Sequence, residues 1–164
     1  MEKLSLSVEQ WMELIKTDES TTVPVWFHVV SNSMYPFIRA NKDEVMLLPI
    51  KAEVLKTGDI VLFPVKHTNG EYCLHRIYIM DADKVQTMGD ANRSPDGWIP
   101  KSDILGKAVM IRRGNITIDC EDPKWERRFR FWNRFWKIRP IMLLPFRIGG
   151  KCKNIWRKLS KSDS

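Results

Sequence analysis

Apolar residues recur at helical spacing near the N-terminus of the chain. Ser7 and Gln10 stand three residues apart, which is the spacing of a capping box at the start of a helix. The apolar side chains after this start fall on one helix face: Val8, Trp11, Met12 and Ile15. The pattern predicts a short amphipathic helix within residues 1–22.

Between residues 23 and 120 the pattern changes to short runs rich in β-branched and aromatic residues. Turn residues separate the runs, and two of the turns, Asn69-Gly70 and Gly114-Asn115, suit β-hairpins. The runs are VPVWFHVV, DEVMLLPI, GDIVLFPV, EYCLHRIYIM, DKVQTMG, DILGKAVMI and NITID. Short apolar runs bounded by turns predict a mainly β domain of about seven strands.

Helical spacing returns in residues 121–164. Aromatic side chains form one stripe along the predicted helix: Trp125, Phe129, Trp132 and Trp136. Basic side chains gather on the opposite side: Arg127, Arg130, Arg134 and Lys137. The pattern predicts a basic amphipathic helix that ends at Pro140, because proline interrupts a helix interior.

Charge is divided unevenly along the 164 residues, which carry a net charge of +7. Residues 1–120 hold 14 Lys/Arg against 16 Asp/Glu, a balance of −2, and residues 121–164 hold 13 against 4, a balance of +9. A basic helix with many aromatic residues is typical of a segment that lies on an anionic membrane surface. The alternative is that the aromatic stripe packs on the β domain. We expect no nucleic-acid binding, because the aromatic face is continuous and offers no separate platforms for bases.

If the tail is only a membrane anchor, the β domain should fold and act without it.

The three cysteines, Cys73, Cys120 and Cys152, form no C-x-x-C pair, which argues against a disulfide framework and a zinc site. We expect no metal and no cofactor. Residues 1–20 lack the pattern of a signal peptide, and the apolar run IMLLPF is too short to cross a membrane. We therefore expect a cytoplasmic protein, peripheral on the inner face of the membrane.

Candidate chemistry begins with the stretch SNSMYP, which places Ser31 and Ser33 between an apolar run and a proline. A serine hydroxyl becomes a nucleophile when a base within hydrogen-bonding reach takes its proton. His75 lies in the strand-like run YCLHRIYIM, where alternation puts it on an apolar face with Cys73. Desolvation there favours the neutral imidazole, which suits a base. A strand histidine can equally be an ordinary core residue.

Two aspartates, Asp90 and Asp96, lie in the turn-rich stretch TMGDANRSPDGW. A carboxylate in this stretch could fix the tautomer of a histidine on a neighbouring strand. Both residues can also be plain turn formers, since aspartate is frequent in turns beside glycine and asparagine. The sequence leaves open whether Asp90 or Asp96 would orient the histidine.

Five short motifs, taken in order, resemble the type I signal peptidase family. They are S-x-S-M-x-P (31–36), G-D-I-V-x-F (58–63), L-H-R-I (74–77), M-G-D-x-N followed by an aspartate (88–96) and I-L-G-K-A-V (104–109). The histidine resembles the endoplasmic-reticulum and archaeal branch, whereas the bacterial branch uses a lysine as its base. The resemblance implies the mainly β, coiled-sheet peptidase fold that this family shares with LexA-type repressors.

The resemblance also implies a role for each matching residue. Ser33 would be the nucleophile and His75 the general base. Asp96 matches the aspartate that orients the histidine, and Asp90 would play a supporting part. Ser31 corresponds to the serine whose hydroxyl, together with the backbone N–H of Ser33, stabilises the tetrahedral oxyanion.

Members of this branch carry a transmembrane helix ahead of the nucleophile, and here a charged amphipathic helix takes that place. We therefore expect a serine endopeptidase that cleaves a leader or precursor peptide, bound in extended form, through a Ser33/His75 acyl-enzyme. Two alternatives stay open: a true signal peptidase with an unusual anchor, and a non-enzymatic regulatory or binding module like the repressors. The expected organisation is a helix in residues 1–22, a catalytic β domain in 23–120 and a basic tail in 121–164.

Overall fold

A computed structural model describes residues 7–17, 23–49, 55–66, 68 and 70–144. The helices are α1 (Val8–Thr17), α2 (Pro123–Arg134), α3 (Arg139–Met142) and the 3-10 helices η2 (Lys101–Asp103) and η3 (Trp136–Ile138). The strands are β1 (Val25–His28), β2 (Asp43–Leu48), β3 (Ile60–Pro64), β4 (Tyr72–Met80), β5 (Lys84–Met88), β6 (Trp98–Pro100), β7 (Gly106–Arg113) and β8 (Ile116–Asp119). The rest of the basic tail, including Cys152 and Trp156, lies outside the described residues.

The predicted N-terminal helix is present as α1. The Ser7 N–H donates to Gln10 Oε1 at 2.9 Å, and the Gln10 N–H donates to Ser7 Oγ at 3.2 Å, which completes the capping box. Trp11 is buried, and a Cβ added to Gly106 would lie 2.6 Å from its ring. The helix therefore packs on the first residue of β7, where a glycine leaves room for the indole.

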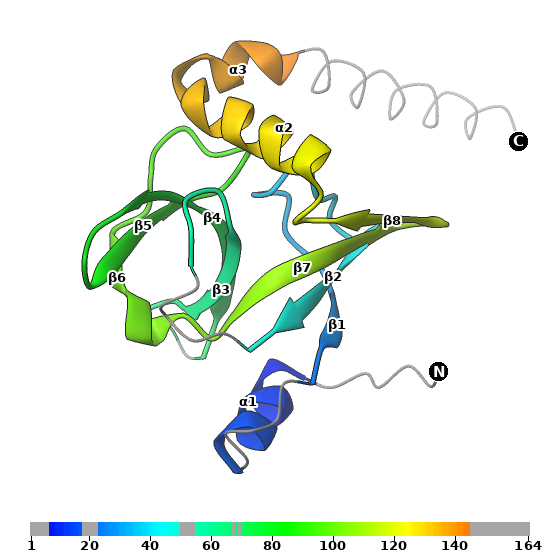
Figure 1. The fold of residues 1–164 in the computed structure, drawn as a ribbon, viewed down its shortest axis with the longest axis vertical. Helices are drawn as coiled ribbons and strands as arrows, with labels where there is room; N and C mark the ends of the chain where they lie inside the picture. The colour runs from blue at the N-terminus through cyan, green and yellow to red at the C-terminus, as the bar shows by residue number, and fades with distance from the viewer. Residues whose placement is uncertain (1–6, 18–22, 50–54, 67, 69, 145–164) are drawn as a thin grey trace, which may run out of the picture.

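The described strands form one antiparallel sheet in the order β1-β2-β7-β3-β4-β5-β6, and β8 also pairs with β7. One edge of β7 pairs with β2, and the other edge is shared by β3 at its start and β8 at its end. The sheet curls into a half-barrel, seen around β3 to β6 in Figure 1. The prediction of a mainly β fold is confirmed. Among the described residues, the one strand beyond the predicted runs is β6, which begins at the end of the turn-rich stretch after β5 and spans three residues, too few for its alternation to be recognised.

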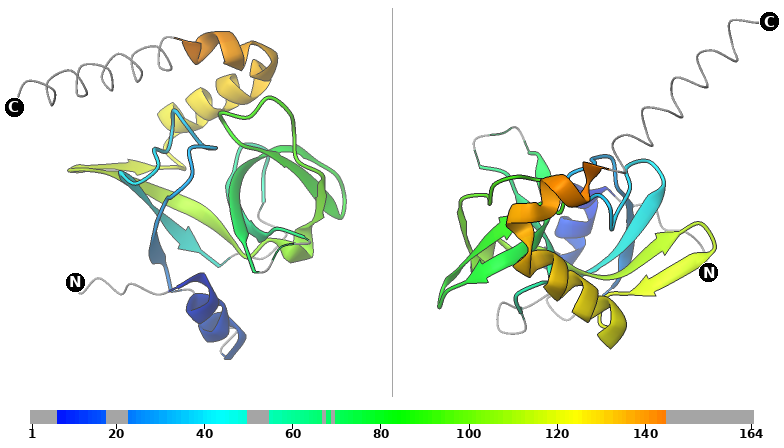
Figure 2. Two further views of the ribbon diagram at one scale, coloured as in Figure 1. Left: turned by 180° about the vertical axis from the view of Figure 1, so that it is seen from behind. Right: turned by 90° about the horizontal axis from the view of Figure 1, so that it is seen from above.

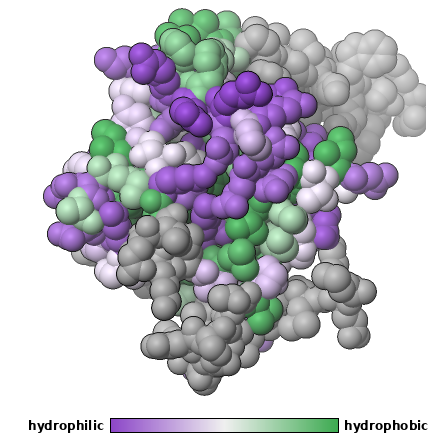
Figure 3. Space-filling model, in the orientation of Figure 1, coloured by the Kyte–Doolittle hydropathy of each residue, from purple (hydrophilic) through white to green (hydrophobic). Residues whose placement is uncertain are grey.

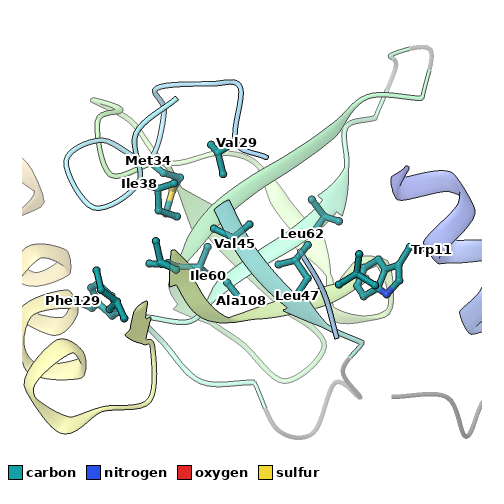
Figure 4. Packing of buried hydrophobic residues seen from close by; sticks show 13 residues of the cluster. Trp11, Val29, Met34, Ile38, Val45, Leu47, Ile60, Leu62, Ala108 and Phe129 are labelled. Carbon is teal, nitrogen blue, oxygen red and sulfur yellow. The ribbon is translucent and has the colours of Figure 1, made fainter. Parts of the chain in front are cut away.

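A hydrophobic cluster connects the sheet to both long helices. Figure 4 shows Trp11 of α1 at one end of this cluster and Phe129 of α2 at the other, with Val45, Ile60 and Ala108 of the sheet between them. A second cluster lies among the strands of the half-barrel: Leu55, Val61, Phe63, Ile77, Val85, Ile99 and Ile104. The half-barrel and the helices are thus held by separate sets of apolar contacts.

The C-terminal helices lie at the end of the molecule away from α1 (Figures 1 and 2). Helix α2 ends at Arg134 and not at the predicted Pro140. The chain turns through η3, and Pro140 then fits the first turn of α3, where its missing N–H costs nothing. No described helix is long and apolar enough to cross a membrane.

The aromatic stripe of α2 faces the β domain. Phe129 and Trp132 are buried, and both rings meet the Phe37 ring edge-on at centroid distances of 5.1 and 5.4 Å. Trp136 makes a similar edge contact with Tyr78 at 5.8 Å. The stripe that could have faced a membrane therefore packs on the sheet.

Candidate active site

Ser33 lies in the loop between β1 and β2, and this loop is fastened to the loop that follows β5. The Ala91 N–H donates to the Ser33 carbonyl oxygen at 2.8 Å. A Cβ added to Gly89 would lie 2.7 Å from the same oxygen, so a glycine is required where the two loops approach. The motifs S-x-S-M and M-G-D, distant in sequence, are thus neighbours in space.

His75 is buried in β4, opposite Val61 of β3. Its Nδ1 and Asp96 Oδ2 share a hydrogen bond of 2.6 Å. Thr87 Oγ1 of β5 donates to the same carboxylate oxygen at 2.7 Å, and the Asp96 N–H donates to the Thr87 carbonyl at 2.8 Å. Because Asp96 is anchored on β5 in this way, it fixes the orientation of the imidazole.

Asp90 forms an ion pair with Arg76. The guanidinium donates from Nε to Oδ1 at 2.9 Å and from Nη2 to Oδ2 at 2.7 Å, and both side chains are fully buried. Neighbouring residues of a strand point to opposite faces, so this pair lies on the other side of β4 from His75. The geometry therefore answers the question that the sequence leaves open: Asp96 contacts the histidine, and Asp90 anchors the loop that contacts Ser33.

Ser33 and His75 line one cavity of about 510 Å³. Much of the remaining wall is apolar and comes from the first three strands and the loop after β1, including Phe27, Val29, Val45, Leu47 and Leu62. The Ser33 hydroxyl and the His75 ring, both among the described residues, share no hydrogen bond in this structure. Since Asp96 occupies Nδ1, Nε2 is the ring nitrogen left for another partner. In enzymes without substrate, a nucleophile and its base are often further apart than in the reacting complex.

Ser31 contacts the backbone of the candidate nucleophile. The Ser33 N–H donates to Ser31 Oγ at 3.2 Å. The two groups that the family resemblance assigns to the oxyanion are therefore bonded to each other. An oxyanion would replace this bond, with the N–H and the rotated hydroxyl both donating to it.

The electrostatics of His75 differ from the expectation of a neutral imidazole. Burial lowers the pKa of His75, but the hydrogen bond with Asp96 and the nearby Cys73 thiol favour the charged ring and raise the pKa to about 9. The pKa of Asp96 is lowered, since the bonds from His75 and Thr87 outweigh the effect of its own burial. The expectation of a neutral imidazole considered only the apolar strand face and missed these partners. At neutral pH the pair is an imidazolium beside a carboxylate.

The C-terminal helices also bond to the loop that contacts Ser33. Trp132 Nε1 donates to the Asp90 carbonyl at 3.1 Å, and Arg139 Nη1 donates to the Gly89 carbonyl at 3.1 Å. Arg139 is 1% exposed, and its other donors bond to the Trp132 carbonyl at 3.2 Å and to Asn133 Oδ1 at 3.3 Å. In the sequence, Trp132 is one residue of the aromatic stripe and Arg139 is one of many basic residues of the tail, so neither could be recognised as a neighbour of the Ser33 loop.

Comparison with protein-family models and with curated proteins finds no match to this chain. Any assignment of function therefore depends on its own residues and on the geometry of this site.

Proposed function

We propose that this protein is a serine endopeptidase of the signal-peptidase/LexA-like superfamily, closest to the branch that uses a histidine base. The observation that carries the proposal is the His75–Asp96 pair, bonded at 2.6 Å, whose histidine lines the same cavity as Ser33. An ordinary core histidine needs no short bond to a carboxylate that is itself held by a neighbouring strand. The curled antiparallel sheet supports the same proposal at the level of the fold.

In the proposed reaction, Ser33 Oγ attacks the carbonyl carbon of the scissile bond while His75 Nε2 takes the hydroxyl proton. The Asp96 carboxylate holds Nδ1 and stabilises the imidazolium that forms. The oxyanion is held by the Ser33 N–H and the Ser31 hydroxyl. His75 returns the proton to the leaving amine, which leaves an acyl-enzyme, and water then hydrolyses the ester by the same base.

The proposed substrate is an extended segment of a leader or precursor peptide. Strand β1 is the terminal strand of the sheet, and Phe27 and His28 of this strand line the cavity. A strand with a free edge can pair with an extended peptide through backbone hydrogen bonds. The apolar wall of the cavity suits uncharged side chains near the cut. The proposed place of action is the cytoplasm, at the inner face of the membrane.

The test measures cleavage of a peptide library by mass spectrometry. We expect Ser33→Ala and His75→Ala each to abolish cleavage, and the double variant to be no worse, because residues that act as one unit are not additive. Ser102→Ala, which changes an exposed serine on η2, serves as the matched control and should keep full activity. Cleavage by Ser33→Ala protein at the wild-type rate would refute the mechanism.

A further inference from the structure

The outer side of the C-terminal helical segment carries a group of exposed apolar side chains. Five of the ten large apolar residues that are exposed in the described part of the chain fall between residues 131 and 144. They are Phe131, Phe135, Ile138, Ile141 and Leu144, with exposed fractions from 39% to 72%. The Phe131 and Phe135 rings contact each other at a centroid distance of 4.6 Å. Single exposed apolar residues are common, but a group of this size on one short segment indicates an interaction surface.

Basic side chains surround this apolar group. Exposed cations of the same segment are Lys124, Arg127, Arg128, Arg130, Arg134 and Lys137. The one acidic residue between positions 123 and 144 is Glu126, and it is already bonded to Lys56. None of the six cations forms an ion pair with another described residue. Figure 3 shows apolar residues over α3 at the top of the molecule and strongly polar residues over α2 below them.

A hollow of about 430 Å³ lies beside the apolar group. Lys124, Arg127, Arg128 and Phe131 line it, together with Phe37 and Trp132. Three cations and three aromatic rings around one shallow space suit an anionic group that carries an apolar chain.

We propose that these five apolar residues and six cations form a lipid face, an interfacial binding surface for an anionic phospholipid bilayer. Cations near an anionic bilayer attract its surface, and apolar side chains beside them enter the boundary between headgroups and acyl chains. The lipid face is distinct from the aromatic stripe, because Phe129 and Trp132 are buried against the sheet. Membrane binding therefore leaves the packing of the helices on the β domain intact.

The composition of the lipid face argues against two other partners. Ile138, Ile141 and Leu144 are aliphatic and cannot stack on bases, as a surface for single-stranded nucleic acid requires. A second copy of the chain would bring six unpaired cations against six others if the same face paired with itself, and like charges at an interface are unfavourable.

The test is co-sedimentation of the full chain with vesicles of phosphatidylcholine alone and of phosphatidylcholine mixed with phosphatidylglycerol. Binding should require phosphatidylglycerol, weaken with added salt and persist in part at high salt. Lys124→Gln combined with Arg127→Gln should lower the partition coefficient about fivefold per cation removed. Ile141→Ser should lower it about tenfold at low and high salt alike, because apolar burial is not screened. The matched control is Lys42→Gln with Ile116→Ser, which removes one exposed cation and one exposed apolar residue elsewhere and should bind like the wild type.

Three results would overturn the proposal. The first is a full chain that ignores phosphatidylglycerol vesicles. The second is an Ile141→Ser variant that binds as well as the wild type. The third is binding that salt removes completely and that double-stranded DNA matches, which would make the surface a general polyanion site. The substituted residues are exposed, so melting temperatures close to that of the wild type are expected and separate lost binding from lost folding.

Discussion

At the scale of single residues, the raised pKa of His75 sets the pH dependence of the proposed reaction. A general base must be neutral, and the bond to Asp96 and the nearby Cys73 thiol hold the pKa of His75 at about 9 in the free protein. We therefore expect kcat/KM to rise with pH and to reach half of its limit near pH 9. Asp96→Asn removes the negative charge that favours the imidazolium. The substitution should therefore shift the rise of kcat/KM to lower pH and reduce kcat. Profiles of rate against pH for the wild type and the variant measure both effects.

If kcat/KM instead rises between about pH 6 and 7, the ordinary range of histidine, the Asp96 bond does not favour the imidazolium in the reacting protein. A profile unchanged by Asp96→Asn would remove Asp96 from its proposed role.

The same pKa shift predicts a pH dependence of folding stability. The pKa of His75 is raised from 6.5 to about 9 on folding, so its contribution is fully present below pH 6.5 and is lost as pH rises through about 9. A shift of this size corresponds to on the order of 3 kcal/mol. Chemical denaturation at a series of pH values should show this alkaline loss in the wild type. The loss should be absent from His75→Gln, and an equal loss in that variant would assign it to another group.

At the scale of secondary-structure elements, α2 and α3 bond to the loop after β5 that contacts Ser33, through Trp132 and Arg139. In the proposed reaction, Arg139 would act through the Gly89 carbonyl, as a positioning residue. Arg139→Met should loosen the contact between this loop and Ser33. We expect kcat to fall about tenfold to a hundredfold with little change in KM, since small displacements of reacting groups are costly. Arg134→Met, an exposed change in the same segment, is the control and should keep its kcat with a soluble peptide.

A merely structural role of Arg139 would give a different result. Lower thermal stability with unchanged kcat would mean that Arg139 supports folding and does not position the loop. Hydrogen exchange of the Ala91 amide, which donates to Ser33, gives a second measurement that does not require turnover.

The elements show which features the sequence could predict. Capping at Ser7 and Gln10 is local, so α1 could be located from a few residues. The strands followed from alternation and turns, except β6, whose three residues are too few to alternate visibly. The helix at the C-terminus was recognisable, but its partner was not, because an aromatic stripe has the same spacing whether it packs on lipid or on protein. Which aspartate reaches His75 depends on the pairing of β4 with β5, which no local pattern specifies.

At the scale of the whole molecule, the described part of the tail shares its hydrophobic packing with the β domain. Phe129 of α2 belongs to the same cluster as residues of the sheet, and Trp132 is buried beside it. Uneven charge along the sequence suggested a boundary near residue 120. The packing of α2 argues against two independent parts, because the aromatic side of this helix is buried in the same cluster as residues of the sheet.

The last prediction concerns this dependence. A chain that ends at Asp119 loses Phe129, Trp132 and Arg139, and loss of one buried aromatic side chain alone costs about 3–5 kcal/mol. A domain of this size has a total stability of about 5–15 kcal/mol, so the shortened chain should not fold cooperatively and should expose an apolar surface. A chain that ends at Leu144 is the matched control, since it keeps these contacts and should melt in one transition. Thermal melts and dye binding to exposed apolar surface distinguish the two. A cooperative melt of the chain that ends at Asp119, with full hydrolysis of a soluble peptide, would show that the helices are an accessory and that the β domain holds its own active site.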